Sequence, residues 1–289
     1  MSSKRTPLLL LGAALFISLM LEPTPERLVV LAIVAVISGI LLLLRTRAQR
    51  VTGMIICCAL LFLFKGMIIE EIMIYNVKTG ITTEPEVHWS APDAHVRLGG
   101  QEITFYEDDN YNHVLGKATA CYWLDNSTAL IAAHSCPGLD EQATLPIRIL
   151  SGAGDSDILS AVILTNNDYG VTLGLTTDFL PTENVYPIAA TSEIVVGAEA
   201  EIISYRGGSF PVLVKGFVSL KYLNEQAIVV EPVSSTNPFI QGKSGSPIVQ
   251  NGKIIGFISM APEEHLGLCR LAAEIYANTA DSMNEYTEK

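Results

Sequence analysis

The sequence predicts an all-β domain, a barrel or a sandwich, that follows a short series of membrane-spanning helices. Apolar residues make up 49% of the 289, and they are concentrated in residues 1–69, whereas the rest of the chain consists of short β-type runs between turn residues. Charge divides near the same place. Residues 1–65 hold seven basic and two acidic residues, and the remainder holds 11 basic and 28 acidic residues. A basic, apolar head and an acidic body indicate a membrane anchor joined to a water-soluble domain.

Three apolar segments fill the head, at residues 7–21, 28–44 and 51–69. A helix needs about 20 apolar residues to span a bilayer, within a range of about 17–25. The second segment meets this length, and the third does so if Lys65 extends its ammonium group to the interface. The first segment is short, but no small-residue cleavage site follows it, as a signal peptide would require. We therefore expect about three transmembrane helices, with two as the alternative.

Basic residues set the expected orientation of the head. Lys4 and Arg5 precede the first apolar segment, residues 45–50 (RTRAQR) separate the second from the third, and residues 22–27 (EPTPER) are net acidic. Because basic flanks remain in the cytoplasm, the N-terminus is expected there and the chain after residue 70 is expected outside it. The lipid bilayer is thus one expected partner. Nucleic acid is not, because the acidic body lacks the clustered lysines and arginines that phosphate binding requires.

Three regions are expected along the chain. Residues 1–69 form the anchor, residues 70–97 show no sustained period and are expected to be a stalk, and residues 98–289 form the folded domain. The β-type runs of that domain are short and dense, with helix expected only near 276–287, which is typical of a barrel or a sandwich. The Asn-Gly of QNGK (250–253) predicts a two-residue hairpin turn. The runs expected as strands are 101–106, 117–124, 128–133, 157–165, 170–175, 200–205, 212–220, 227–232, 246–250 and 253–260.

The stretch GKSGSP (242–247) carries the strongest chemical signal in the sequence. A phosphate-binding loop is excluded, because it needs a glycine where Asn237 stands and a helix that Pro247 does not allow. A serine between glycines is instead typical of a nucleophile, since glycines let backbone N–H groups approach a reacting oxygen closely. Gly242 and Ser244 are the residues expected to supply those N–H groups.

A serine hydroxyl attacks a carbonyl carbon only with a base and a group that orients the base. His134 follows the apolar run TALIAA, and Asp168 precedes the apolar run GVTLGL. Singly, a histidine at a strand end and an aspartate in a turn are ordinary structural residues. In an oxidising compartment Cys121 and Cys136 can form a disulfide. A zinc site built from Cys121, His134 and Cys136 lacks a fourth ligand at the usual spacing, so no metal and no cofactor are expected.

The snippets AAHSC, NDYGVTLGL and GKSGSP resemble, in this order, the histidine, aspartate and serine motifs of the trypsin-like (chymotrypsin superfamily) serine peptidases. The gaps of 34 and 76 residues resemble those of the compact bacterial members, the Deg-type and staphylococcal glutamyl peptidases. The block SGSPIVQNGKIIG is also similar to the stage IV sporulation signalling peptidases, a membrane-tethered group. The resemblance covers residues 100–289. It implies two antiparallel β-barrels, chymotrypsin-like, at about 98–180 and about 185–275, with a short C-terminal helix.

The resemblance further implies a membrane-tethered serine endopeptidase that cleaves peptide or protein substrates through an acyl-enzyme. In this family pattern Ser244 is the nucleophile, His134 the base, and Asp168 the acid that orients the base. The similarity to the sporulation peptidases makes Glu231 the alternative acid. The backbone N–H groups of Gly242 and Ser244 would form the oxyanion hole.

Other residues follow from the same resemblance. A disulfide between Cys121 and Cys136 is expected near the histidine. Lys243 stands where trypsin-type zymogens carry an aspartate, so activation by a cut that frees a new N-terminus is not expected. The substrate pocket is expected to be uncharged. Ser259, one of its residues, occupies the place of a family serine that contacts the aspartate. The residues expected to line the pocket are Phe239, Ile258, Ser259 and Met260.

Two other hypotheses compete with the enzyme. One is a catalytically inactive, protease-like binding or signalling module, which the intact set of serine, histidine and aspartate disfavours. The other is a membrane-organising component whose peptidase cuts a single partner or itself. Labelling by a fluorophosphonate probe that is lost in Ser244→Ala distinguishes the enzyme from the module.

Overall fold

The computed structural model describes residues 74–107, 110–133, 140–151, 154–179, 184–204, 208–220, 225–234, 239, 243–263 and 265–287. The chain divides into two compact units, residues 1–79 and 80–289. The three predicted membrane segments at residues 1–69 lie outside the described residues. Within the described ranges, no helix has both the length and the apolar character needed to cross a bilayer.

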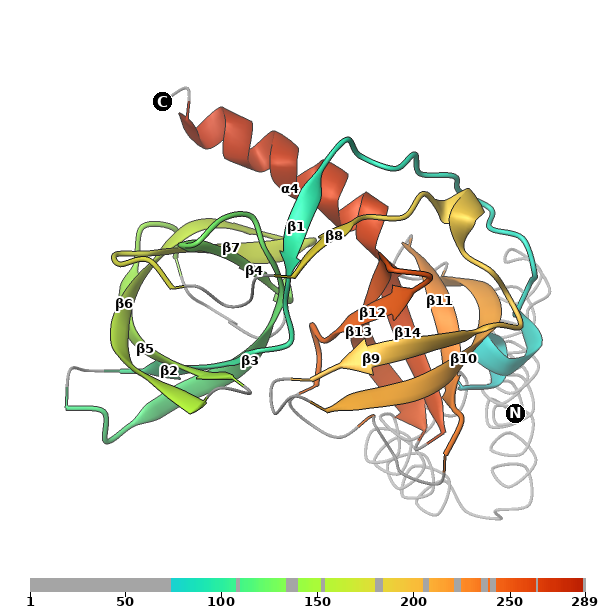
Figure 1. The fold of residues 1–289 in the computed structure, drawn as a ribbon, viewed down its shortest axis with the longest axis horizontal. Coiled ribbons are helices and arrows are strands. Elements are labelled where there is room, and N and C mark those ends of the chain that lie inside the picture. Colours follow the sequence, from blue (N-terminus) through green and yellow to red (C-terminus); the bar gives the residue numbers. More distant parts are fainter. Residues whose placement is uncertain are drawn as a thin grey trace, which may run out of the picture. The chain divides into compact units, whose positions relative to one another are not determined.

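The first half of the second unit is a closed, six-stranded antiparallel barrel, as Figure 1 shows. Its strands run in the order β2-β5-β6-β7-β4-β3, and the pairing of β2 with β3 closes it. Two short strands, β1 and β8, extend the sheet beyond β3. The strand bounds are β1 His95–Leu98, β2 Glu102–Tyr106, β3 Val114–Trp123, β4 Thr128–Ile131, β5 Thr144–Ser151, β6 Gly154–Asn167, β7 Gly170–Leu175 and β8 Val185–Pro187.

Alternating burial explains why these segments form a barrel. In β5 the side chains of Leu145, Ile147 and Ile149 are buried, and the residues between them are more exposed. A period of two places every second side chain on the inner face of a closed sheet. The inner faces together form one apolar core, which includes Ile103, Phe105, Ala118, Ala120, Trp123, Ala129, Ile131, Ile163, Val171 and Leu173.

The second half is another closed, six-stranded barrel, with strand order β10-β11-β14-β13-β12-β9. Its β12–β13 hairpin pairs Gln250 with Lys253, and the two residues between them, Asn251 and Gly252, have φ of 51° and 74°. Positive φ at both central positions is the type I′ geometry that favours Asn-Gly, so the predicted turn is confirmed. The bounds are β9 Glu199–Ile203, β10 Ser209–Leu220, β11 Glu225–Pro232, β12 Pro247–Gln250, β13 Lys253–Glu263 and β14 Leu266–Leu271.

A C-terminal helix, α4 (Ala272–Thr287), follows β14 directly. It begins four residues before the expected range of 276–287, because Ala272 and Ile275 continue the apolar run of β14 and are buried. Both join a third apolar cluster that contains Tyr122 of the first barrel and Phe257 of the second. The predicted all-β fold of two antiparallel barrels with a short C-terminal helix is thus confirmed for the described residues.

Residues 82–89, which fall within the expected stalk, are bound along the second barrel. Thr82 and Phe217 exchange two backbone hydrogen bonds, of 2.8 and 2.9 Å. The buried side-chain amide of Gln226 accepts the N–H groups of Glu86 and Val87, at 2.6 and 2.9 Å, and donates to the Val87 carbonyl at 3.1 Å. This segment, called the strap below (residues 82–89), is therefore a fixed part of the unit.

Gly216→Ala tests the attachment of the strap. A Cβ at Gly216 would lie 2.3 Å from the Thr82 carbonyl oxygen, and the residue has φ of +148°. We expect a loss of about 3 kcal/mol in the free energy of unfolding, from strain and collision together. Gly252→Ala is the matched control, because its φ is +74° but nothing lies within 4 Å of the added Cβ. It should cost about 1 kcal/mol. Urea unfolding followed by tryptophan fluorescence measures both, and equal losses would contradict a close contact at Thr82.

Candidate active site

The predicted nucleophile, Ser244, lies in a tight turn of the second barrel. Ser246 N–H donates to the Lys243 carbonyl at 2.9 Å, which makes residues 243–246 a β-turn with Ser244 in its second position. Gly245 follows with φ of +94°, the backbone geometry that a type II turn requires at its third position and that favours glycine. Two further hydrogen bonds tie the turn to β13, from Gly245 N–H to the Ile258 carbonyl at 2.7 Å and from Ile258 N–H to the Ser246 carbonyl at 3.0 Å.

The same turn contacts the first barrel. A Cβ at Gly245 would lie 2.4 Å from the carbonyl oxygen of Thr119 and 3.4 Å from the sulfur of Cys121, both on β3. Any side chain here would collide with β3 backbone, so glycine is required by space as well as by φ. The serine turn of the second barrel is thereby held against β3 of the first barrel.

Ser244 lies next to Ser259, one of the residues predicted to line the substrate pocket. The half-buried Ser244 hydroxyl donates a long hydrogen bond, 3.4 Å, to the Ser259 carbonyl on β13. Gly245 N–H donates to Ile258 of β13 and Ser246 N–H donates to Lys243, but the N–H of Ser244 has no acceptor among the described residues. The other predicted oxyanion donor, Gly242, lies outside the described residues.

His134 also lies outside the described residues, but the strand that leads to it is defined. β4 ends at Ile131, which pairs with Ala120 of β3 on one side and Val171 of β7 on the other. Position 134 lies three residues after Ile131, and position 168 lies three residues before Val171. The antiparallel register therefore brings the chain toward both positions at the same end of the β4–β7 pair. Ala120 is adjacent to Thr119, the residue that contacts the serine turn.

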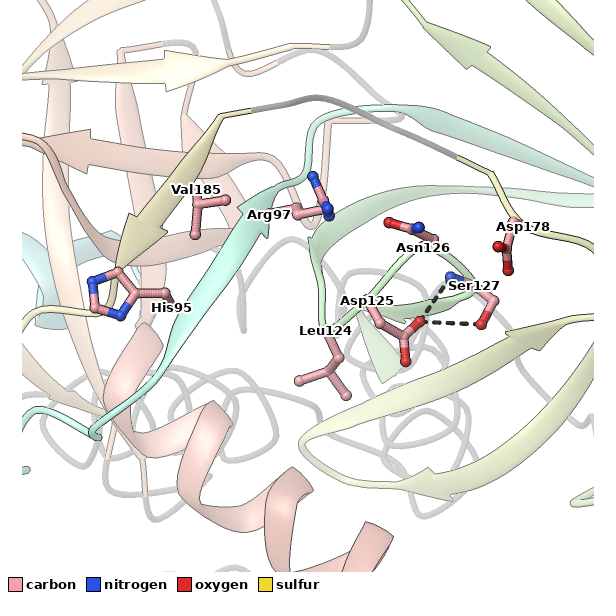
Figure 2. Close-up of a pocket in the computed structure, with 8 residues that line it drawn as sticks. All are labelled: His95, Arg97, Leu124, Asp125, Asn126, Ser127, Asp178 and Val185. Atoms are coloured by element: carbon pink, nitrogen blue, oxygen red, sulfur yellow. Dashed lines mark hydrogen bonds between the residues drawn. The ribbon is translucent and has the colours of Figure 1, made fainter.

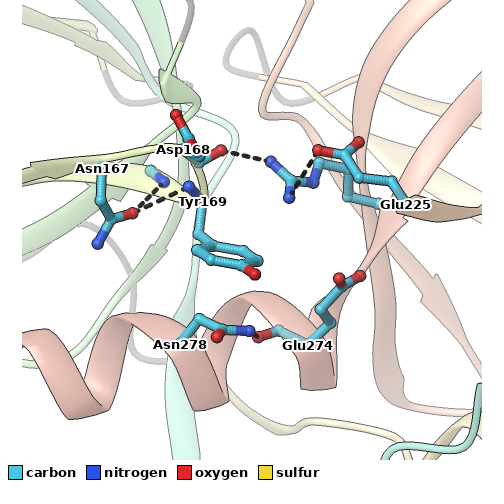
Figure 3. A network of polar contacts seen from close by, with 8 residues as sticks. Asn167, Asp168, Tyr169, Glu225, Glu274 and Asn278 are labelled. Carbon is cyan, nitrogen blue, oxygen red and sulfur yellow. Dashed lines mark hydrogen bonds and ion pairs between the residues drawn. The ribbon is translucent and has the colours of Figure 1, made fainter. Parts of the chain in front are cut away.

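Asp168 forms part of the β6–β7 turn and is exposed. The Asn167 side chain accepts the N–H groups of Tyr169 and Gly170, at 2.9 and 3.1 Å, and so shapes the turn. The Asp168 backbone carbonyl accepts a hydrogen bond of 2.7 Å from Arg270 of β14, as drawn in Figure 3. The carboxylate itself has no hydrogen-bond or ion-pair partner among the described residues. Tyr169 lies beneath Arg270, with 5.1 Å from the ring centroid to the guanidinium carbon.

The predicted pocket residues divide into two pairs. Phe239 and Ile258, 8% and 3% exposed, belong to the core of the second barrel. Ser259 and Met260 are partly exposed beside a β-bulge in β13 and are the described candidates for direct contact with a substrate. Glu231, the alternative acid, forms an ion pair of 3.1 Å with Lys215 across β10 and β11.

The predicted disulfide is wrong for Cys121, which is a free and buried thiol in the structure. The register of β3 against β4 shifts between Ala120 and Tyr122, so Cys121 occupies a bulge. Its side chain joins the apolar cluster between the barrels and faces Gly245 of the serine turn. Cys136, the predicted partner, lies outside the described residues.

A surface pocket of about 460 Å³ opens elsewhere on the first sheet, as Figure 2 shows. Desolvation raises the pKa of Asp125 in its wall, but hydrogen bonds from Ser127 and Thr128 outweigh it and hold the pKa below the usual value. These bonds identify the β3–β4 turn as a structural one. No predicted site residue lines the pocket, whose walls are His95, Arg97, Leu124, Asp125, Asn126, Ser127, Asp178 and Val185.

Two residues near the serine turn and the β6–β7 turn, Arg270 and Ser246, were not predicted from the sequence. Arg270 is the single charged residue in LGLCRL, and its isolation in an apolar strand was the available signal. Ser246 is fully buried, and its hydroxyl has no hydrogen-bond partner among the described residues. No group of three histidine, cysteine or carboxylate side chains able to hold a metal occurs in the described ranges. Two members of the zinc alternative, His134 and Cys136, fall outside those ranges.

Known proteins resemble part of this chain. Residues 152–261 match the family model described as SpoIVB peptidase S55, a range that includes Asp168 and Ser244. A comparison with curated protein sequences finds no significant match.

Two solved structures are similar to part of this chain at low identity. An inactive mutant form of Rv3671c from M. tuberculosis H37Rv is 13% identical, with a TM-score of 0.43 over 63% of this chain and 86% of that one. The HtrA-type protease AlgW, solved with a decapeptide, is 16% identical, with a TM-score of 0.45 over 68% of this chain and 65% of that one. Neither similarity bears on which residues act.

The free state of Cys121 is tested by alkylation without a reducing agent. Burial raises the pKa of both Cys121 and Cys269, so neither thiol should react with iodoacetamide in the folded protein. Both should react once the chain is unfolded in urea, as read by peptide mass spectrometry. Cys269 is the matched control, because it is also a free and buried thiol in the structure. A Cys121 that reacts only after reduction, beside a Cys269 that reacts without it, would restore the disulfide.

Proposed function

We propose that the chain is a membrane-tethered serine endopeptidase of the trypsin-like type, with Ser244 as nucleophile, His134 as base and Asp168 as orienting acid. The family match over residues 152–261 supports the class of enzyme. The assignment of the three residues rests on one observation, the contact of the serine turn with β3.

That contact supports the assignment through the order of the strands. β3, which touches the serine turn, pairs with β4, whose end leads to His134. β4 pairs in turn with β7, whose start is preceded by Asp168. Three segments far apart in the sequence thus converge on one end of neighbouring strands, which is the arrangement that a nucleophile, a base and an orienter require.

The chemistry follows from these roles. The Ser244 hydroxyl attacks the carbonyl carbon of the scissile peptide bond while its proton passes to His134. The N–H of Ser244, which has no acceptor among the described residues, is available to the oxyanion together with that of Gly242. His134 then gives the proton to the leaving amine, and water hydrolyses the acyl-enzyme. Asp168 holds the imidazole in the required tautomer and stabilises the imidazolium.

Glu231 is less suited to the role of the acid. Its carboxylate already pairs with Lys215, 3.1 Å away, on adjacent strands of the second barrel. Asp168, by contrast, lies in the first barrel beside the strand that leads to His134. This difference favours Asp168.

Replacement of these residues tests the mechanism. Ser244→Ala should abolish fluorophosphonate labelling and lower kcat for a peptide substrate by about a millionfold. Asp168→Asn should lower kcat by about 10,000-fold, because the amide leaves the histidine in the wrong tautomer. Glu231→Gln distinguishes the two acids and should change kcat by less than about threefold.

Three outcomes would contradict parts of this mechanism. A folded wild-type protein that is neither labelled nor active would favour the protease-like binding module. Loss of activity in Glu231→Gln, with Asp168→Asn active, would transfer the role of the acid to Glu231. Labelling that persists in Ser244→Ala would place the nucleophile elsewhere.

We further propose that residues 1–69 anchor the peptidase and that it acts outside the cytoplasm. The apolar segments and the basic residues that flank them support this orientation. The chain should stay in the membrane pellet after alkaline carbonate extraction. A tag at the C-terminus should be removed by protease added to intact spheroplasts. Extraction by carbonate would exclude the anchor, and a protected tag would reverse the orientation.

A further inference from the structure

Arg270 joins the second barrel to the turn that carries Asp168. Its Nη1 donates to the Asp168 carbonyl at 2.7 Å, and its Nη2 pairs with Glu225 of β11 at 3.0 Å. Its guanidinium also lies over the ring of Tyr169, at 5.1 Å. Figure 3 draws the hydrogen bond and the ion pair as dashed lines, with Glu274 and Asn278 of α4 labelled below them. One side chain thus connects β14, β11 and the β6–β7 turn.

The surroundings of Arg270 are largely closed to water. Its side chain is 13% exposed and that of Glu225 is 22% exposed. Glu274 of α4 is buried, and one of its carboxylate oxygens has no partner among the described residues. Desolvation raises the pKa of Glu274, nearby Arg270 lowers it, and Glu225 raises it further. Among the described residues, the charged or titratable side chains that interact with the guanidinium are Glu225, Glu274, Tyr169 and the Cys121 thiol.

A guanidinium in this position is not explained by stability alone. Removing an ion pair from water costs several kcal/mol, and apolar residues of similar volume often stabilise a protein as well or better. Arginine does offer a planar fork that donates in two directions at once. Here one donor goes to Glu225 and another to a backbone carbonyl, so the fork fixes the Asp168 backbone relative to β11.

We propose that Arg270 is a positioning residue for the peptidase reaction. It holds the backbone of Asp168 from one side, while the Asn167 side chain shapes the turn from the other. The backbone held in this way is the turn that precedes β7, and β7 pairs with β4, the strand whose end leads to His134. This inference rests on the proposed function, because it assumes that Asp168 is the orienting acid.

Arg270→Gln tests the proposal in the full-length protein. We expect kcat to fall about 100-fold with KM little changed, because a misplacement of about 1 Å has this effect on oriented groups. The acid limb of the kcat/KM profile should move to lower pH, since an imidazolium that loses its carboxylate has a lower pKa. Arg270→Lys should recover only part of the loss, because one ammonium group cannot reach both partners. Lys215→Gln, which removes an ion pair within the second barrel, is the control and should leave kcat and the profile unchanged.

A double variant separates positioning from general stability. In an Asp168→Asn background, Arg270→Gln should lower kcat by less than about threefold, because the side chain it positions is already gone. A further 100-fold loss there would overturn the proposal. So would wild-type kcat in a folded Arg270→Gln beside an inactive Asp168→Asn. If Arg270→Gln does not fold, Arg270→Lys decides, and wild-type kcat in that variant would equally overturn it. Wild-type kcat in Asp168→Asn would instead refute the proposed triad, and Arg270 as its positioning residue with it.

Discussion

The structure depends on the contact between Gly245 and the Thr119 carbonyl. The two barrels have separate cores, and the serine turn crosses from one to the other at this point. A Cβ at Gly245 would lie 2.4 Å from the carbonyl oxygen, so the turn can approach β3 only because residue 245 has no side chain. An apolar cluster that includes Tyr122, Phe257 and Ala272 buries the surface around this contact. Hydrophobic burial brings the barrels together, and the glycine sets how closely the serine approaches.

Local features could be predicted from the sequence, and contacts between distant segments could not. Alternating apolar residues indicated the strands, and Asn-Gly indicated the β12–β13 turn, because both signals are contained in a few neighbouring residues. The direction of the Cys121 side chain instead depends on a bulge in its pairing with β4, which alternation does not reveal. The predicted disulfide was therefore wrong, although the strand around it was expected.

The strap and Arg270 were missed for related reasons. Residues 82–89 show no hydrophobic period, because the barrel binds them through the backbone: Gln226 pairs with N–H and C=O groups that every sequence contains. Backbone recognition leaves little trace in side-chain patterning. Arg270 was visible only as one charge in an apolar strand, and its partners lie 45 and 102 residues away in the chain. The three motifs, in contrast, carry their chemistry in consecutive residues, which is why Ser244, His134 and Asp168 could be nominated together.

Strand β11 connects the strap to Arg270. Gln226 binds the strap, and its neighbour Glu225 binds Arg270, which in turn binds the Asp168 backbone. Successive residues of a strand point to opposite faces, so one short segment serves the strap on one side and the inter-barrel contact on the other. The backbone of Asp168 is therefore held by the same strand that fixes the chain where it enters the unit. Glu225 and Gln226 are adjacent on this hydrogen-bonded strand, so neither can shift without the other. The strap and the Asp168 backbone are therefore held in a fixed relation to each other.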